Sequence, residues 1–197
     1  MTQPYGIILA GGLARRMGGG DKALLPLGSG VLLNQVMNRI TFQTANTAIN
    51  ANGDAVRWNA FNCPVIPDTV ADFPGPLAGV LSGMRWAASQ GATHIVSVAG
   101  DTPFFPSDLV LQLMQAAERQ GKPIALAATK DGWHPTFGLW PVDLADDLEM
   151  ELRAGTRKIL RWAEKHGMAQ AMFSSDDVDP FFNINTPEDL AKAQGMV

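Results

Sequence analysis

The sequence has little cysteine, little histidine and little charge. Its one cysteine, Cys63, cannot form an internal disulfide, so nothing indicates an oxidising compartment. The three histidines lie far apart in the sequence, which argues against a zinc site of His and Cys. Charged residues make up 17% of the chain, against roughly 25% in typical soluble domains. The net charge of −4 argues against nucleic acid as a non-specific partner, because such binding needs a basic surface.

Long apolar runs and a targeting signal are also missing. No stretch approaches the run of about 18 apolar residues that a membrane-spanning helix needs. The N-terminus, MTQPYGIILAGG, lacks a basic segment, and its apolar run is too short for a signal peptide. We therefore expect a cytoplasmic protein with no membrane partner. A length of 197 residues, 46% of them hydrophobic, suits one domain over 1–197.

Strands and helices alternate along the chain. Residues 5–9 (YGIIL) read as a short buried strand that breaks into a glycine-rich loop, and eight of the 20 glycines fall in residues 1–30. Further strands are expected at 47–51, 63–66, 93–99, 124–129, 136–140 and, weakly, 171–173. Helices are expected at about 31–44, 76–90, 108–120, 144–152, 156–166 and 187–194. This alternation predicts a three-layer α/β/α sandwich with a mostly parallel sheet.

Two helix starts carry local signals. Ser107 or Asp108 is expected to cap the helix that stops at Gly121. Thr186 is expected to cap the last helix, because Pro187 then takes the first helical position and acidic residues follow in the first turn.

The loop after the first strand has the composition of a phosphate-binding site. It reads LAGGLARRMGGGDK over residues 9–22, where glycines allow backbone N–H groups to face an anion and Arg15, Arg16 and Lys22 add positive charge. It matches neither the Walker A nor the GxGxxG pattern. The plainer alternative is a surface loop with solvated basic residues.

A second segment, SVAGDTP over residues 97–103, places Asp101 directly after a buried strand. In an open parallel sheet, ligands bind beyond the carboxyl ends of the strands. A carboxylate there is suited to Mg²⁺, which takes one or two carboxylates together with phosphate oxygens and water. Asp101 could instead form only a turn. Together the two segments point to a nucleoside triphosphate with Mg²⁺ as cofactor.

These motifs resemble those of the nucleotidyltransferases with a Rossmann-like fold. LAGGxxxRMGxxDK follows the first strand, and within that family the chain looks like the molybdenum cofactor guanylyltransferases. The residues that favour them are DK at 21–22, DFPGPLAG at 72–79, HPT at 134–136 and FNINTPEDL at 182–190. The resemblance spans residues 7–190 and implies a Rossmann-like sheet. It implies transfer of GMP from GTP to the terminal phosphate of molybdopterin, with or without molybdenum, and release of pyrophosphate.

The resemblance also implies roles for individual residues. The nucleotide would be bound by Leu9, Ala10, Gly11, Gly12, Lys22, Asn50, Asp68 and Asp101. Catalytic roles would fall to Arg16, Lys22 and Asp101, with Asp101 as the Mg²⁺ ligand. The acceptor substrate would be bound by Gly75, Gly79, Arg157, Asn183 and Asn185, the last three toward the pterin. Partners would be GTP, molybdopterin or the molybdenum cofactor, and cofactor-supplying or acceptor molybdoenzyme proteins.

Several readings stay open beside this one. Asn50 could end a strand, Asp68 could form a turn, and Arg157 could be a solvated surface residue. A cytidylyltransferase acting on the same pterin shares the first motif. A non-catalytic nucleotide-binding cofactor carrier on this fold is a further alternative, although the presence of both Lys22 and Asp101 argues against it. A sugar-phosphate nucleotidyltransferase is less compatible with 197 residues. We expect no covalent nucleotidyl-enzyme, because the acceptor phosphate is ionised near neutral pH and can itself act as the nucleophile, so Cys63 is not needed in that role.

Overall fold

The computed structural model describes residues 2–11, 19–70, 75–175 and 179–197. Seven strands build its central sheet: β1 (Tyr5–Leu9), β4 (Thr47–Asn50), β5 (Val65–Ile66), β6 (His94–Ala99), β7 (Ile124–Thr129), β8 (Gly132–Pro141) and β9 (Met168–Met172). Their order across the sheet is β5-β4-β1-β6-β8-β7-β9. β8 runs antiparallel to its neighbours β6 and β7, and the other neighbouring pairs are parallel. The expected mostly parallel sheet is confirmed.

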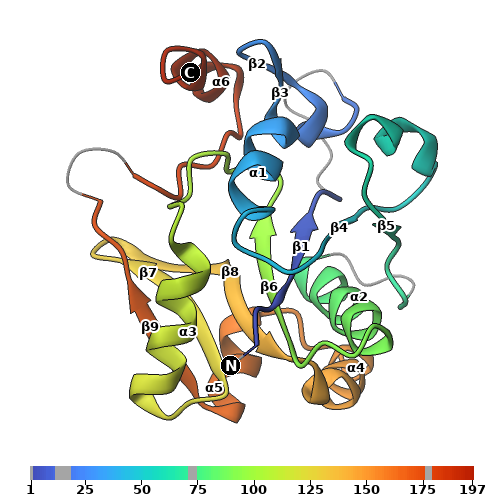
Figure 1. The fold of residues 1–197 in the computed structure, drawn as a ribbon, viewed down its shortest axis with the longest axis vertical. Coiled ribbons are helices and arrows are strands. Elements are labelled where there is room, and N and C mark those ends of the chain that lie inside the picture. The colour runs from blue at the N-terminus through green and yellow to red at the C-terminus, as the bar shows by residue number, and fades with distance from the viewer. Residues whose placement is uncertain (1, 12–18, 71–74, 176–178) are drawn as a thin grey trace.

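Helices cover both faces of the sheet. The α-helices are α1 (Leu32–Ile40), α2 (Pro76–Ser89), α3 (Leu109–Gln120), α4 (Ala145–Arg153), α5 (Ile159–His166) and α6 (Pro187–Gln194). α1 and α3 lie on the near face in Figure 1 and pack in one core cluster, which includes Ile8. α2, α4 and α5 pack in a second cluster, which includes Ile7. Because successive strand residues face opposite sides, Ile7 and Ile8 anchor two different layers, and the three-layer sandwich is confirmed.

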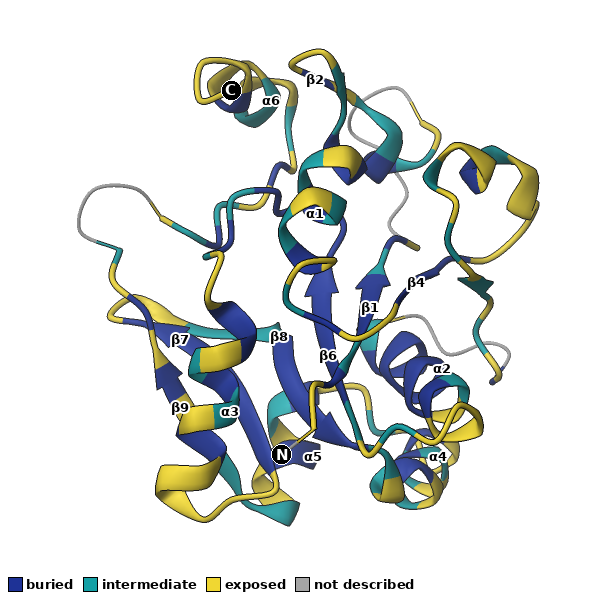
Figure 2. Ribbon diagram, viewed as in Figure 1, coloured by how far each residue is buried: buried dark blue, intermediate teal, exposed yellow. Residues whose placement is uncertain are grey.

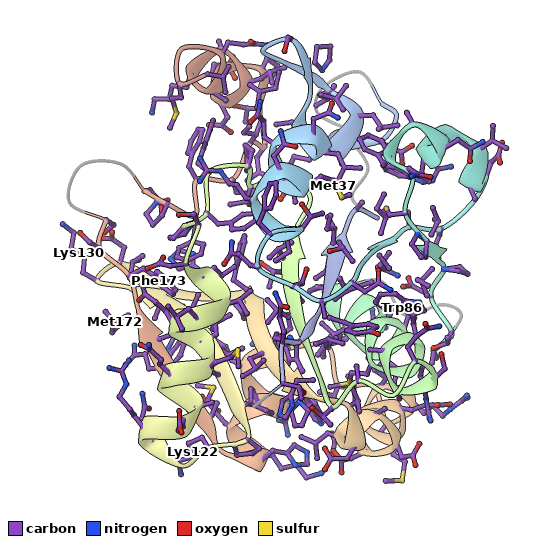
Figure 3. All side chains as sticks on the ribbon, viewed as in Figure 1. Met37, Trp86, Lys122, Lys130, Met172 and Phe173 are labelled. Carbon is purple, nitrogen blue, oxygen red and sulfur yellow. The ribbon has the colours of Figure 1, made fainter. Side chains whose placement is uncertain are left out.

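Burial follows this layered arrangement. Figure 2 shows the strands as largely buried and the outer sides of the helices as exposed. At the edge strand β9, Met172 points away from the molecule with 52% exposure, whereas the next residue, Phe173, points inward with 5% (Figure 3). None of the described helices is long and apolar enough to cross a bilayer.

Smaller elements complete the fold. A two-stranded hairpin, β2 (Pro26–Leu27) with β3 (Gly30–Val31), leads into α1. It packs beside α6 at the top of Figure 1 around a small apolar cluster. Three short 3-10 helices lie in the connections between larger elements: η2 (Lys22–Leu24), η3 (Ala55–Phe61) and η4 (Val142–Leu144). The hairpin and these 3-10 helices were not predicted from the sequence.

Several expected boundaries are wrong. The helix expected at 31–44 ends at Ile40. Met37 O still accepts from Thr41 N at 3.1 Å and also from Thr41 Oγ1 at 2.8 Å, and Ile40 O accepts from a side chain, Thr44 Oγ1, at 3.0 Å. The strand expected at 171–173 covers 168–172 and the one expected at 63–66 covers 65–66, while the strand at 136–140 extends over 132–141. The helices expected at 144–152 and 156–166 cover 145–153 and 159–166.

Of the two predicted helix caps, the one at α3 is wrong and the one at α6 is confirmed. Asp108 is the residue before α3, but its side chain accepts from Gln112 Nε2 at 2.8 Å and caps no backbone N–H. Thr186 caps α6 as expected, since its Oγ1 accepts from Asp189 N at 3.1 Å.

Candidate active site

The expected site lies where parallel strands β1, β4 and β6 end side by side. Ala10 N donates to Asn50 O at 2.9 Å, and Gly100 N donates to Leu9 O at 3.0 Å. A Cβ on Gly100 would lie 3.2 Å from Leu9 O and 3.3 Å from Ala10 Cα, tighter than usual contacts. Glycine at 100 therefore lets the backbone that leads to Asp101 pass close to the end of β1.

Lys22 occupies the centre of this edge. Its Nζ donates to Asp101 Oδ2 at 2.7 Å, to Asn185 Oδ1 at 2.5 Å and to Asn183 Oδ1 at 3.2 Å. A lysine ammonium has three N–H donors, so each can be assigned to one of these oxygens. Only 10% of the Lys22 side chain is exposed. The structure thus places three predicted residues, Asp101, Asn183 and Asn185, around the Lys22 cation, although they lie 79 or more positions from it in the sequence.

Asp101 combines partial burial with an accessible carboxylate. Its side chain is 22% exposed, and Thr102 Oγ1 donates to its Oδ1 across a long 3.3 Å. Its backbone carbonyl accepts from Ile184 N at 3.0 Å, which joins the loop after β6 to the segment before α6. Backbone hydrogen bonds therefore hold the chain around Asp101 in place, and its carboxylate oxygens can accept further hydrogen bonds or bind a metal ion.

Asp101 is the candidate metal ligand of the described chain. Among the residues that the structure describes, no group of three or more His, Cys, Asp or Glu side chains could hold a metal ion. A single accessible carboxylate still fits Mg²⁺, which commonly takes few protein ligands and completes its shell with phosphate oxygens and water. The geometry fits a metal that arrives with a phosphate ligand.

A second cluster lies at the ends of β4 and β5. Asn50, which is 5% exposed, donates from Nδ2 to Asp68 Oδ1 at 2.9 Å and to Ile66 O at 3.1 Å. Asn52 Nδ2 donates to Asp68 Oδ2 at 2.7 Å, and Asp68 N donates to Asn52 Oδ1 at 2.8 Å. Each carboxylate oxygen of Asp68 accepts one amide bond and retains a further acceptor site. This cluster can accept hydrogen bonds from a ligand.

Gly79 permits this cluster to pack on α2. A Cβ at position 79 would overlap Asn50 Oδ1, its nearest neighbour, and would lie 2.7 Å from Leu9 Cδ2 and 2.9 Å from Asn50 Cγ. No side chain fits there unless Asn50 moves. Gly75 immediately precedes α2 with φ of +141°, a conformation that favours glycine.

The remaining predicted residues have different placements. Gly11 is exposed at the end of β1. Arg157 is exposed and lies in the segment before α5. Gly12 and Arg16, like Arg15, lie outside the described residues.

Sequence reasoning missed three residues beside the site. Asn52 holds Asp68, as described above. Arg57 donates to Asn52 O, and its Nε lies 2.6 Å from Asp21 Oδ2 in an ion pair that lacks hydrogen-bond alignment. Asp189 accepts backbone bonds from the segment that carries Asn185. Asn52 lies two residues from Asn50, and this spacing on one side of a strand end was the available signal.

An aromatic cluster borders the Asn183 segment. His134 stacks on Phe181 with ring centroids 4.3 Å apart, and its Nε2 lies 3.0 Å from Thr129 Oγ1. Burial lowers the pKa of His134 below its usual value. His134 is therefore suited to packing and hydrogen bonding as a neutral ring near neutral pH.

Known proteins share both sequence and fold with this chain. Residues 6–170 match the model of the MobA-like NTP transferase domain. The chain is 48% identical over 197 residues to a protein of Mesorhizobium japonicum named molybdenum cofactor guanylyltransferase, covering 98% of this chain and 95% of that one. It is 47% identical to a protein of the same name from Rhodopseudomonas palustris, covering 98% and 92%.

Solved structures agree on the fold. Molybdopterin-guanine dinucleotide biosynthesis protein A from Archaeoglobus fulgidus superposes with a TM-score of 0.75 at 24% identity, covering 98% of this chain and 97% of that one. A CMP:2-keto-3-deoxy-manno-octonic acid synthetase complexed with CTP superposes with a TM-score of 0.76 at 13% identity, covering 99% and 98%. The family match, the extensive identity and the clustered motif residues together show that this chain belongs to the MobA-like NTP transferases, among the molybdenum cofactor guanylyltransferases.

Proposed function

We propose that this chain transfers GMP from GTP to the terminal phosphate of molybdopterin, free or carrying molybdenum. An oxygen of the acceptor phosphate attacks the α-phosphorus of GTP, the bond to the bridging oxygen of the β-phosphate breaks, and pyrophosphate leaves. The observation that carries the proposal is the Lys22 cation, which Asp101, Asn183 and Asn185 surround at the carboxyl edge of the sheet.

The chemistry needs charge neutralisation more than proton transfer. The acceptor is a phosphate monoester whose second pKa is about 6, so it is ionised near neutral pH. Its approach to a triphosphate is opposed by repulsion between anions. Lys22 can exchange one of its hydrogen bonds to an amide oxygen for a hydrogen bond to a phosphate oxygen. Main-chain N–H groups of the loop after β1 can donate further hydrogen bonds to the phosphates. In-line positioning supplies the rest.

Mg²⁺ is part of this proposal, with Asp101 as its protein ligand. Bound there, the ion would neutralise charge on the phosphate oxygens. We also propose that Arg16 contributes positive charge from the glycine-rich loop. Mg²⁺ fits this site because the Asp101 carboxylate is partly exposed and its Oδ1 accepts only a long hydrogen bond from Thr102 Oγ1, which leaves this oxygen available to a metal ion.

The Asn50–Asp68 cluster would select the base by hydrogen bonding to it. Guanine presents N1–H and an amino group as donors and O6 as an acceptor. Asp68 retains acceptor capacity on both oxygens, and the backbone near Leu9, Ala10 and Gly11 lies beside Asn50. A pocket built to hydrogen-bond a base rejects bases that leave its polar atoms unpaired. We therefore propose GTP as the nucleotide substrate.

The acceptor would approach from the side of Asn183 and Asn185. Both amides contact Lys22 and lie on the segment before α6, whereas Gly79 supports the nucleotide side through Asn50. We propose Gly75 and Arg157 as further acceptor contacts on the basis of the family resemblance. The proposal includes a cytoplasmic location and protein partners that supply molybdopterin or receive the finished cofactor.

The deciding experiment measures pyrophosphate release with molybdopterin and GTP, CTP or ATP, with and without Mg²⁺. We expect the highest kcat/KM with GTP and no turnover without the metal. A preference for CTP would replace the proposal by a cytidylyltransferase. Nucleotide-dependent thermal stabilisation without any pyrophosphate would indicate a non-catalytic carrier, because a ligand that binds only the native state raises its stability.

A further inference from the structure

The start of α6 is tied to the Lys22 cluster by a single carboxylate. Asp189 Oδ2 accepts from Asn185 N at 2.9 Å and from Thr186 N at 2.9 Å, while Thr186 Oγ1 accepts from Asp189 N at 3.1 Å. Such a capping box is found at many helices and normally satisfies only the helix end. Here one of the two N–H groups belongs to Asn185, whose side chain contacts Lys22 Nζ at 2.5 Å.

The rest of α6 is anchored to the segment that follows Lys22. Gly28 N donates to Gln194 Oε1 at 3.0 Å, and Gln194 Nε2 donates to Pro26 O at 3.0 Å, which joins the end of α6 to the β2–β3 hairpin. Ile184 is fully buried in the cluster with Leu27. Figure 1 shows α6 beside this hairpin, on the site side of the sheet. α6 therefore holds Asn185 at one end and the chain after Lys22 at the other.

Asp189 itself lies outside the expected substrate contacts. Its pKa is held below its usual value, first by the backbone N–H of Asn185, which agrees with a charged acceptor at this helix start. Without Oδ2, the N–H groups of Asn185 and Thr186 lose their side-chain acceptor. The Asn185 backbone would then be less restrained, and Lys22 would lose one of its three oxygen partners for part of the time.

We propose that Asp189 is a positioning residue, which holds Lys22 for phosphate transfer by fixing the backbone of Asn185. The inference rests on the proposed function for its catalytic consequence, but the restraint on Lys22 can be measured without turnover. The competing account is that Asp189 only stabilises α6, in which case its loss would leave the Lys22 amine as protected as before.

The first test measures the reactivity of the Lys22 amine. The full-length protein is pulsed with an amine-acylating reagent, and modification is quantified by mass spectrometry with the exposed Lys158 as internal reference. We expect Asp189→Ala to raise Lys22 modification about two- to tenfold, the range that corresponds to loss of one hydrogen bond. Asp189→Asn keeps a carbonyl oxygen as acceptor and should restore protection.

Glu188→Ala is the matched control. Glu188 is exposed in the same first turn and takes no part in the cap, so this variant removes a carboxylate from the same helix end. Equal Lys22 modification in Asp189→Ala and Glu188→Ala would overturn the inference. Thermal denaturation of each variant establishes that the comparison is made on folded protein.

The second test is a double-mutant cycle on kcat/KM for GTP. If Asp189 acts through Asn185, the double variant Asp189→Ala/Asn185→Ala should be no less active than Asn185→Ala alone. Additive losses would contradict the inference. Absence of pyrophosphate release by the wild type would refute the proposed function instead, and the labelling result would still decide the role of Asp189.

Discussion

Gly79→Ala introduces a single methyl group at the point where α2 contacts the Asn50–Asp68 cluster. The new Cβ would overlap Asn50 Oδ1, its nearest neighbour, and would lie 2.9 Å from Asn50 Cγ, whereas ordinary contact begins at 3.4 Å. The Asn50 side chain must therefore rotate away or retreat by well over 0.5 Å. Either movement disturbs the 2.9 Å bond from Asn50 to Asp68. Misplacement on the ångström scale can cost about a hundredfold in rate, so we expect kcat/KM for GTP to fall about ten- to a hundredfold.

The expected effect on stability is small by comparison. Overpacking in a filled interior costs about 1–3 kcal/mol, and replacing glycine by alanine inside a helix offsets about 1 kcal/mol of that. The net destabilisation is about 0–2 kcal/mol. For a chain of this length each kcal/mol lowers Tm by about 2–4 °C, so Tm should fall by no more than about 8 °C. The variant should remain folded at 25 °C.

Gly83→Ala is the matched control, because it lies one turn further along α2. Its Cβ would lie 2.9 Å from Ile7 Cγ1, so this position is also crowded, though less severely, and only by an apolar side chain of β1. We expect a measurable loss of Tm, no larger than that of Gly79→Ala, with kcat/KM for GTP close to wild type. Steady-state kinetics and thermal denaturation of the three proteins test this. Equal kcat/KM in the two variants would refute the assignment of Asn50 to the nucleotide site.

Four further predictions use other parts of the molecule. Asp101→Asn should lower turnover at least about a hundredfold with the fold intact, because it removes the anionic ligand that we propose for Mg²⁺; unchanged pyrophosphate release at limiting Mg²⁺ would exclude that role. Lys22→Ala should weaken GTP binding, measured by calorimetry, far more than guanosine binding, and equal losses would indicate a collapsed loop instead. Asp68→Ala should reduce the ratio of kcat/KM for GTP to that for CTP more than it lowers kcat with GTP; an unchanged ratio would assign base reading to the backbone. The pKa of Asp147 lies below its ordinary 3.8, mainly because Trp162 Nε1 donates a hydrogen bond to the carboxylate and also because His166 contacts it. The Asp147 charge therefore stabilises the fold above about pH 3.8, and this stabilisation is lost as pH falls through the depressed pKa. The stability difference between wild type and Asp147→Asn, from urea unfolding, should thus shrink as pH falls below about 3.8, and a difference independent of pH would contradict this.

Local sequence patterns were sufficient for the elements whose signals are contained in a few neighbouring residues. Periodic apolar residues predicted α2, and the run before Asp101 predicted β6, because burial on both faces demands continuous hydrophobicity in a parallel strand. The Thr186–Pro187 start of α6 was likewise readable, since capping is a contact between residues three apart. The association of glycine and basic residues after β1 pointed to the edge of the sheet that carries the Lys22 cluster.

Tertiary structure decided the features that depend on partners far along the chain. Lys22 and Asn185 are 163 residues apart, and their contact follows from the docking of α6 on the β2–β3 hairpin. The antiparallel direction of β8 also follows from a neighbouring strand that a local pattern does not contain. Asn52 acquires its role only when β5 places Asp68 beside it. A sequence motif can therefore specify which chemical groups reach the site, whereas the oxygen atoms that surround Lys22 are selected by the free energy of packing the whole chain.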